Sequence, residues 1–197
     1  MIDEMNMQKY DVKIYPLTER EIDKKVVWYN DPDIRKYLHY TNFFNIQDSL
    51  KWLDRIKESN TRKEFVIWIC EGRMEIPVGI IGLFEIDREN RKAGFYITLG
   101  EKKYQGKGIA KKATVMFLRK MFEQFSLHKI YLYTDVENKP ARRLYEKIGF
   151  TLEGIMRDEL FYQNHYVSRC YYSMLFEEFE EKWGMKDASG NWKCITN

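Results

Sequence analysis

A strand, a loop with glycines and a helix follow one another within residues 96–117, and this stretch constrains the chain more than any other. An apolar run ends at Gly100, and a loop containing Gly106 and Gly108 follows. From Ile109 onward, apolar residues recur at helical spacing. Two glycines separated by one residue leave backbone N–H groups unobstructed at the start of a helix, where the helix dipole favours negative charge. The stretch therefore predicts a phosphate-binding loop.

Lysines in the same loop and in the first turns of the helix add a positive field to these backbone donors. They are Lys102, Lys103, Lys107, Lys111 and Lys112. Together they favour a ligand that carries several phosphates. The alternative interpretation is a tight turn followed by a solvated helix face, and a glycine loop by itself does not separate the two.

The order of residues in the loop indicates which kind of phosphate site it forms. Neither the P-loop pattern nor the dinucleotide pattern Gly-x-Gly-x-x-Gly is present. Residues 105–110, Gln-Gly-Lys-Gly-Ile-Ala, instead resemble the Gln/Arg-x-x-Gly-x-Gly/Ala signature of the GNAT superfamily of N-acetyltransferases. Residues 138–150, which begin Asn-Lys-Pro-Ala and end Ile-Gly-Phe, are similar to its second signature. Two signatures at compatible spacing are more specific than either one.

A third likeness lies near the start of the chain. Residues 28–32, Trp-Tyr-Asn-Asp-Pro, resemble a stretch of the superfamily branch that includes ribosomal-protein alanine and spermidine acetyltransferases. The resemblance thus extends over most of the chain. It implies acetyl-coenzyme A as the acetyl donor, and two parallel strands that splay apart to admit its pantetheine arm.

The pattern of expected elements is that of one α/β domain. Helices are expected after Thr18, Asn45, Gly108 and Asn138, and strands at 11–17, 65–70, 78–87, 92–99, 129–136, 152–160 and 166–176. The strand-helix-strand order around the loop requires a parallel pair with a right-handed crossover. We predict a single GNAT-type domain at 1–176, with a mixed, mostly antiparallel sheet, a splayed parallel strand pair and flanking helices. A tail at 177–197 holds one short helix at most.

Composition excludes several classes of function. The 33 Lys and Arg against 30 Asp and Glu give a net charge of +3, too small to indicate a nucleic-acid partner. No run of about 18 apolar residues suggests a membrane span, and the first residues do not resemble a signal peptide, so we expect a cytoplasmic protein. The cysteines lack metal-ligand spacing, and no metal is expected.

Acyl transfer from a thioester to an amine needs a polarised carbonyl, a deprotonated amine and a proton for the leaving thiolate. The resemblance implies a backbone N–H near Leu99 for the carbonyl and the Tyr145 hydroxyl for the thiolate. Tyr145 also belongs to the apolar stripe of its helix, so packing is the alternative role. Glu85, near the end of the third strand, ranks first as the base. Other possible bases are Glu153, Glu159, His39 and His165.

The resemblance also implies a set of cofactor contacts. They are Leu99, Gln105, Gly106, Lys107, Gly108, Ile109, Ala110 and Asn138. Asn138 is equally suited to cap the helix that follows it, and the two roles can coexist.

The predicted reaction is direct transfer, in a ternary complex, from acetyl-coenzyme A to the primary amine of a small molecule, an amino sugar or a polyamine. The aromatic segment 37–44 either lines the acceptor pocket or packs a helix-helix connection. The alternatives are a protein N-terminal acetyltransferase, a non-catalytic coenzyme A-binding module and an RNA-binding protein. The last strands, with Tyr166, Tyr171 and Tyr172, offer a seam for a homodimer.

Overall fold

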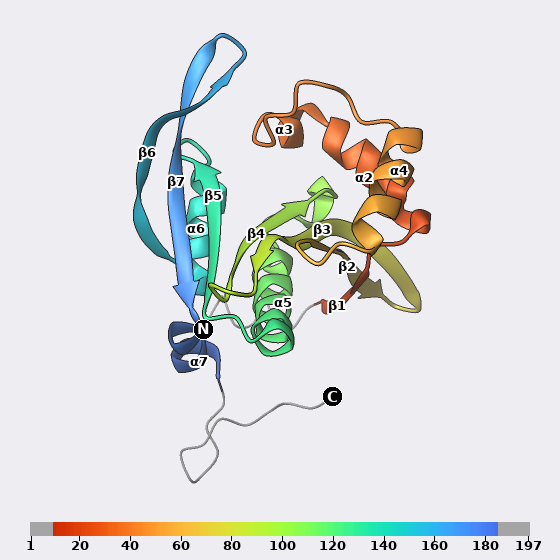
Figure 1. Cartoon of the computed structure of the whole chain (residues 1–197). Helices are drawn as coiled ribbons and strands as arrows, with labels where there is room; N and C mark the ends of the chain where they lie inside the picture. Colours follow the sequence, from red (N-terminus) through yellow and green to blue (C-terminus); the bar gives the residue numbers. More distant parts are fainter. Residues whose placement is uncertain (1–9, 185–197) are drawn as a thin grey trace.

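The computed structural model describes residues 10–184. In this part of the chain, seven strands form one sheet in the order β1-β2-β3-β4-β5-β7-β6 (Figure 1). Only β4 and β5 are parallel neighbours. The strands are β1 (Asp11–Pro16), β2 (Lys63–Glu71), β3 (Met74–Asp87), β4 (Lys92–Leu99), β5 (Lys129–Asp135), β6 (Thr151–Tyr162) and β7 (His165–Leu175). The predicted fold class is confirmed.

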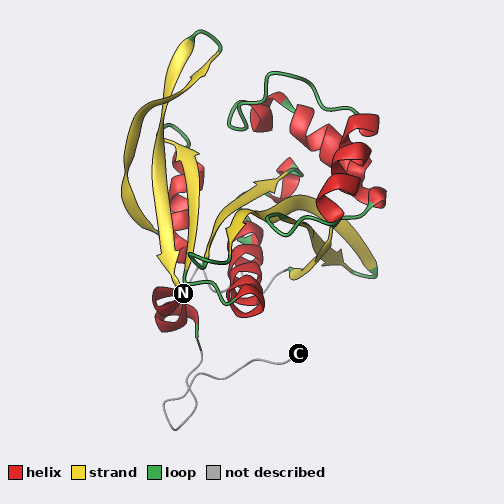
Figure 2. Cartoon of the chain, viewed as in Figure 1, coloured by secondary structure: helices red, strands yellow, loops and turns green. Residues whose placement is uncertain are grey.

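Helices flank the sheet (Figure 2). Those of the described residues are α2 (Ile22–Asn30), α3 (Pro32–Arg35), α4 (Ile46–Lys57), α5 (Ile109–Phe125), α6 (Lys139–Ile148) and α7 (Phe176–Trp183), with 3-10 turns η1 (Glu19–Glu21) and η2 (Lys102–Tyr104). Side-chain caps start them where the sequence predicts: Asn45 accepts from the Asp48 N–H at 2.9 Å and Asn138 from the Ala141 N–H at 3.3 Å. These caps satisfy backbone donors that have no partner inside a helix.

Alternating residues of the central strands supply two separate hydrophobic clusters. On β2, Phe65 packs with Phe117 of α5, whereas the next residue, Val66, packs with Trp28 of α2 and Leu53 of α4. Successive strand residues point to opposite faces, so one face of the sheet carries α5 and the other carries α2 and α4. Figure 1 shows α2, α3 and α4 gathered on the side away from α5 and across from the long β6–β7 hairpin.

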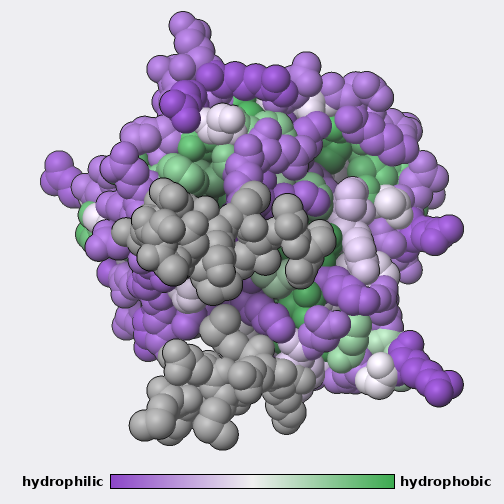
Figure 3. Space-filling view, turned by 90° about the horizontal axis from the view of Figure 1, so that it is seen from below, coloured by the Kyte–Doolittle hydropathy of each residue, from purple (hydrophilic) through white to green (hydrophobic). Residues whose placement is uncertain are grey.

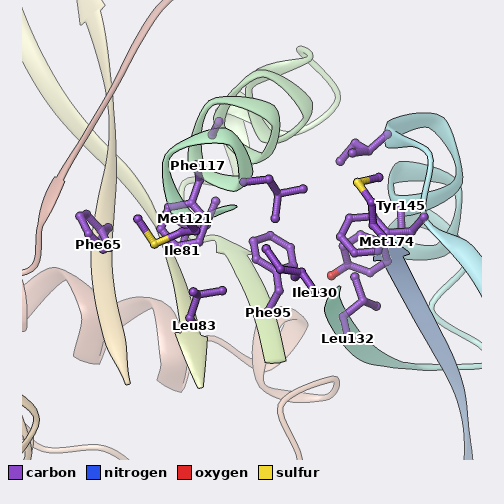
Figure 4. Packing of buried hydrophobic residues seen from close by; sticks show 14 of the residues in the cluster. Phe65, Ile81, Leu83, Phe95, Phe117, Met121, Ile130, Leu132, Tyr145 and Met174 are labelled. Atoms are coloured by element: carbon purple, nitrogen blue, oxygen red, sulfur yellow. The ribbon is translucent and has the colours of Figure 1, made fainter. Parts of the chain in front are cut away.

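The core continues across the junction between β4 and β5. Figure 4 shows Phe95 of β4 lying between the α5 side of the core and the group formed by Ile130, Leu132 and Tyr145. The Phe95 ring lies 6.0 Å from that of Phe117 and 6.5 Å from that of Tyr145. This packing joins the two halves of the sheet although few backbone bonds do.

Most strand boundaries differ from the sequence prediction by one or more residues, and two of these differences have a clear structural reason. Strand β3 begins at Met74, before Pro77, because the β2–β3 pairing shifts register between Ile67 and Trp68. The one extra residue on β3 there, Val78, accommodates the proline, which has no N–H to donate. The β6–β7 connection is also tighter than expected. Only Gln163 and Asn164 separate the strands, and both have positive φ, of 48° and 61°, as two-residue hairpin turns require.

The segment that follows β7 packs on the domain. Phe179 of α7 is fully buried, and the Trp183 indole N–H donates to the Ile148 carbonyl at 2.7 Å. Residues 185–197, the rest of the expected tail, lie outside the described residues, and the boundary at 176 stays a prediction. Seen from below, the described surface is mostly hydrophilic, with smaller hydrophobic areas between (Figure 3).

Candidate active site

The parallel strands β4 and β5 pair along only part of their length. The paired residues are Lys92 with Lys129, Ala93 with Ile130 and Gly94 with Tyr131. Strand β4 remains paired with β3 as far as Leu99, so its β5-facing edge is open beyond Gly94. This is the predicted splayed pair. Backbone N–H and C=O groups on the open edge lack a strand partner and are available to a ligand.

A cavity of about 1390 Å³ lies along this open edge. Residues 95–99 of β4 and 133–134 of β5 form its middle, residues 104–111 form one end, and residues of α2, α4 and the segment 36–45 form the other. One continuous space therefore connects the glycine loop with the helices on the opposite face. Hereafter the first is called the cofactor end and the second the acceptor end.

At the cofactor end, the glycine loop leaves the start of α5 without a side-chain cap. Gly106 and Gly108 have φ of +72° and +78°, a region that residues with a Cβ rarely adopt. Residues 106–110 all line the cavity. Uncapped N–H groups and the helix dipole at this position are suited to bind an anion.

The lysines predicted to surround this loop differ in where they point. Lys107 and Lys111 line the cavity, whereas Lys112 donates to the Tyr10 carbonyl at 2.8 Å, away from it. Lys102 also lines the cavity but is paired with Asp31 at 2.9 Å and Asp33 at 2.7 Å. The positive field at the loop therefore comes mainly from Lys107 and Lys111, and not from all five lysines that the sequence suggested.

Gln105 and Leu99, two predicted cofactor contacts, are joined to each other. The Gln105 amide donates to the Leu99 carbonyl at 3.1 Å, and both residues line the cavity. This contact ties the end of β4 to the loop. The loop is further held by Trp28, whose indole N–H donates to Glu101 at 3.1 Å and whose ring lies where a Cβ on Gly100 would be. The Trp28 stretch thus positions α2 against the start of the loop.

Tyr145 and Asn138 approach the same cavity from α6. Tyr145 is buried, its ring packs on Phe95 and Phe150, and burial raises the pKa of its phenol. Its hydroxyl has no hydrogen bond to the described residues, yet the residue lines the cavity. A phenol with a raised pKa keeps its proton at neutral pH and is able to donate it to a ligand atom.

Glu85 lies away from this region. It sits at a register break in β3 with φ of +49°, is exposed, and accepts a hydrogen bond from the Tyr131 hydroxyl at 2.6 Å. Because β3 runs antiparallel to β4, the end of β3 adjoins the start of β4, where β4 and β5 are still paired. Glu85 is not among the residues lining the cavity. Its role as base stays a prediction that the geometry does not support.

The acceptor end is built from charged and aromatic side chains that no motif indicated. Lys25 of α2 is buried, and burial lowers the pKa of its ammonium group to about 8. Its ammonium lies 3.2 Å from the centre of the Trp52 ring. Arg62 lines the same wall and donates from Nε to the buried carboxylate of Glu64 at 2.8 Å. Lys25 and Trp52 belong to separate helices, so spacing in the sequence gave no signal for this group.

The aromatic segment 37–44 both lines the cavity and packs. Three of its carbonyls accept from one Arg35 nitrogen, and Asn30 exchanges two hydrogen bonds with the Phe44 backbone at 2.7 and 2.8 Å. His39, from the same segment, reaches across to β5, where its Nε2 lies 2.9 and 2.8 Å from the two Asp135 oxygens. The segment therefore both lines the acceptor end and packs the connection between the helices, the two roles that the sequence left open.

The described residues contain no group of three or more His, Cys, Asp or Glu side chains arranged to hold a metal ion. Among the helices described at 10–184, none is long and apolar enough to cross a membrane.

A family model described as an acetyltransferase (GNAT) domain matches residues 11–151. The chain belongs to the GNAT acetyltransferase family. The match includes β4, the glycine loop and α6, the elements that enclose the cavity. The predicted family, fold, enzyme class and acetyl-coenzyme A donor are thereby confirmed, and the protein is an acetyl-coenzyme A-dependent N-acetyltransferase.

The chain is similar to several spermidine N-acetyltransferases of bacteria. It is 29% identical to the spermidine N(1)-acetyltransferase of Escherichia coli K12, over 80% of this chain and 82% of that protein. It is 32% identical to the Vibrio cholerae enzyme of the same name, over 72% and 81%. A solved structure of the Vibrio cholerae spermidine N-acetyltransferase, with CoA and spermine, superposes with a TM-score of 0.78 at 26% identity, covering 85% of this chain and 97% of that one.

Proposed function

We propose that this acetyltransferase transfers the acetyl group directly from acetyl-coenzyme A to the primary amine of a small molecule. The observation that carries the proposal is the single cavity that includes both the uncapped start of α5 and the aromatic acceptor end. Because both ends open into one space, donor and acceptor are able to bind together. No covalent enzyme intermediate is required.

At the cofactor end, the N–H groups of residues 106–110 bind the pyrophosphate, and Lys107 and Lys111 neutralise its charge. The pantetheine arm occupies the open edge of β4, and a backbone N–H near Leu99 polarises the thioester carbonyl. Asn138 keeps its helix cap and lines the same channel. In this arrangement most cofactor contacts are made by the backbone.

The chemistry follows from these positions. The neutral amine nitrogen attacks the carbonyl carbon, the bond from that carbon to sulfur breaks, and the leaving thiolate takes the proton of the Tyr145 hydroxyl. The phenolate then recovers a proton from the amide nitrogen, directly or through water. The position of Tyr145 supports this role, because the residue lines the cavity between the two ends.

Polyamines are the first acceptors to test, because relatives of this chain are named spermidine acetyltransferases and one was solved with spermine. Aromatic rings along the cavity, including Tyr40, Phe44 and Trp52, suit an ammonium group through cation–π contacts. Amino sugars that carry an acidic group are the second class, because Lys25 and Arg62 add positive charge to the same wall.

The test is release of free thiol from acetyl-coenzyme A by the purified chain. The acceptors are spermidine, spermine, an amino sugar, an amino sugar phosphate and the N-terminal peptide of a ribosomal protein. Acetylation of any small amine with kcat/KM well above that for the peptide supports the proposal. Acetylation of the peptide alone would replace it with protein N-terminal acetylation.

A cytoplasmic location and a homodimer also remain proposals. The exposed rings of Phe161 and Tyr166 at the β6–β7 hairpin support a contact between copies. Tyr172, which the sequence placed in the same seam, is fully buried within the chain because its ring faces α6. Light scattering of the purified protein, with Tyr166→Ser as the variant, tests the dimer.

A further inference from the structure

Lys25 holds a charge inside the acceptor end without a carboxylate partner. Its side chain is 4% exposed, and its ammonium lies 3.2 Å from the centre of the Trp52 ring and 5.3 Å from that of Tyr29. Within residues 10–184 it has neither an ion pair nor a hydrogen bond. A buried cation usually has an anionic partner, because its removal from water is costly. Lys25 lines the cavity, so the partner can come from a ligand.

Arg62 presents a second cation to the same wall. Its Nε is held by Glu64, and its guanidinium carbon lies 5.7 Å from the Trp52 ring and 5.5 Å from the Tyr96 ring. The Tyr96 hydroxyl also interacts with the guanidinium, but among the described residues no carboxylate pairs with its two terminal nitrogens. The guanidinium is thus fixed at one end and open to the cavity at the other. Such a fork is suited to a carboxylate or a phosphate.

The carboxylates near this wall offset part of its positive charge. Glu64 is buried, and its carboxylate is paired with Arg62 and also attracts Lys25. Two further carboxylates line the cavity, and both are exposed. Asp33 is paired with Lys102 at 2.7 Å, whereas Asp48 accepts from the neutral Asn45 amide at 2.8 Å and keeps its charge. Lys25 and Arg62 therefore share one buried carboxylate between the aromatic rings.

We infer that Lys25 and Arg62 bind an anionic group of the acceptor, a carboxylate or a phosphate, while its amine extends toward Tyr145. The inference rests on the proposed function and names the substrate class within it. A polyamine fits this wall less well, because each nitrogen beyond the reacting one is itself an ammonium group. An amino acid or an amino sugar phosphate supplies the amine and the anion in one small molecule.

Two matched pairs of acceptors test the inference. Lysine differs from 1,5-diaminopentane by a carboxylate, and glucosamine 6-phosphate differs from glucosamine by a phosphate. For at least one pair, kcat/KM measured by thiol release should be about 10-fold or more higher for the anionic member, and the pair that shows it identifies the anion. Lys25→Met should reduce that ratio about 10- to 100-fold, the effect of losing a charged hydrogen bond.

The control is Lys24→Met, which removes the exposed neighbouring charge on α2 and should leave the ratio unchanged. A preference for the diamine and for glucosamine would overturn the inference, as would a ratio that Lys25→Met leaves intact. Calorimetric titration of lysine and glucosamine 6-phosphate into the protein with coenzyme A separates the two proposals. Binding that Lys25→Met abolishes, without any turnover, would contradict the proposed function alone, whereas absence of binding would contradict the inference.

Discussion

At the cofactor end of the cavity, the groups proposed to bind the ligand are mainly backbone N–H groups of residues 106–110. At the acceptor end they are side chains of Lys25, Trp52 and Arg62, which come from three separate segments. The first end lies within one strand, loop and helix that are consecutive in the chain. The second exists only after α2 and α4 have packed against the sheet beside the start of β2.

This difference has consequences for how each end tolerates change. Backbone donors depend on φ and ψ, so the cofactor end is sensitive to residues that alter the loop conformation. Side-chain groups depend on charge and burial, so the acceptor end is sensitive to substitutions that keep the backbone intact. Tyr145 lines the cavity between the two ends, and we propose that its hydroxyl protonates the leaving thiolate.

The largest effect is expected at this junction. Tyr145→Phe should lower kcat about 10²- to 10⁴-fold while the Kd for acetyl-coenzyme A changes little, because the substitution removes a proton donor and keeps the ring in its packing. Single-turnover kinetics and calorimetry measure the two quantities.

The matched control is Tyr172→Phe. Tyr172 is buried and donates to Glu146 at 2.7 Å, but it does not line the cavity. The variant should lose about 1.5–3 kcal/mol of stability, because the hydroxyl bonds charged groups, and keep its turnover. Equal losses of kcat in both variants would show that Tyr145 has a packing role only. No proton donor would then be identified between the two ends of the cavity.

The next effect is a change in the pH dependence of stability, which the buried charge of Lys25 at the acceptor end should cause. The pKa of Lys25 is lowered from 10.5 to about 8 by burial, so between these values the unfolded chain binds a proton that the folded chain lacks. The free energy of unfolding should therefore rise with pH in this window, by on the order of 3 kcal/mol relative to Lys25→Met. Urea unfolding at pH 7.5, 9 and 10.5 measures it.

Lys24→Met serves as the reference here too, since Lys24 is exposed on the same helix. Its stability curve should run parallel to that of the unmodified chain. If the stability curve of Lys25→Met also runs parallel to that of the unmodified chain, the Lys25 ammonium is not desolvated. The acceptor end would then not differ from the cofactor end by a buried charge.

A third effect concerns the backbone of the cofactor end. Acetyl-coenzyme A at 100 times its Kd should stabilise the chain by about 2.7 kcal/mol. Gly106→Val should abolish most of this shift, because φ of +72° is unsuited to a β-branched residue and the new side chain would alter the loop proposed to bind the pyrophosphate. Thermal unfolding with and without the ligand measures the shift.

Gly72→Val is the control for strain. Gly72 has φ of +62°, and like Gly106 it has no atom within 4 Å of an added Cβ, but it lies in the β2–β3 turn and does not line the cavity. The Gly72→Val variant should lose stability and keep the full stabilisation by acetyl-coenzyme A.

Lys25→Met should also keep the stabilisation by acetyl-coenzyme A. Loss of this stabilisation in Lys25→Met would show that the two ends of the cavity are not independent.

The smallest effect is expected where the segment 36–45 meets β5. His39→Phe removes the contact with Asp135, but Arg35 and Asn30 still hold the segment. We expect the KM for the acceptor to rise about fivefold, the equivalent of about 1 kcal/mol, with the KM for acetyl-coenzyme A unchanged. Steady-state kinetics with either substrate varied distinguishes the two, and the exposed His165, substituted in the same way, is the control.

Local patterns were sufficient for much of the fold. The glycine loop, the N-caps at Asn45 and Asn138 and the apolar stripe of α5 each depend on neighbours within a few residues, and the structure has them where the sequence predicts. Strand boundaries were less predictable. The start of β3 depends on a register shift between β2 and β3 that accommodates Pro77, and such pairing is a property of two strands together.

By itself, the sequence determined the family, the fold class, the acetyl donor and the end of the cavity that lies within residues 96–117, because backbone chemistry there follows from contiguous residues. Only the tertiary structure decided the acceptor end. It moved Glu85 to the closed side of the β4–β5 pair, brought His39 to Asp135 across 96 positions, and enclosed Lys25 between Tyr29 and Trp52. Charge, burial and distance in that region depend on segments far apart in the chain, so no local pattern contains them.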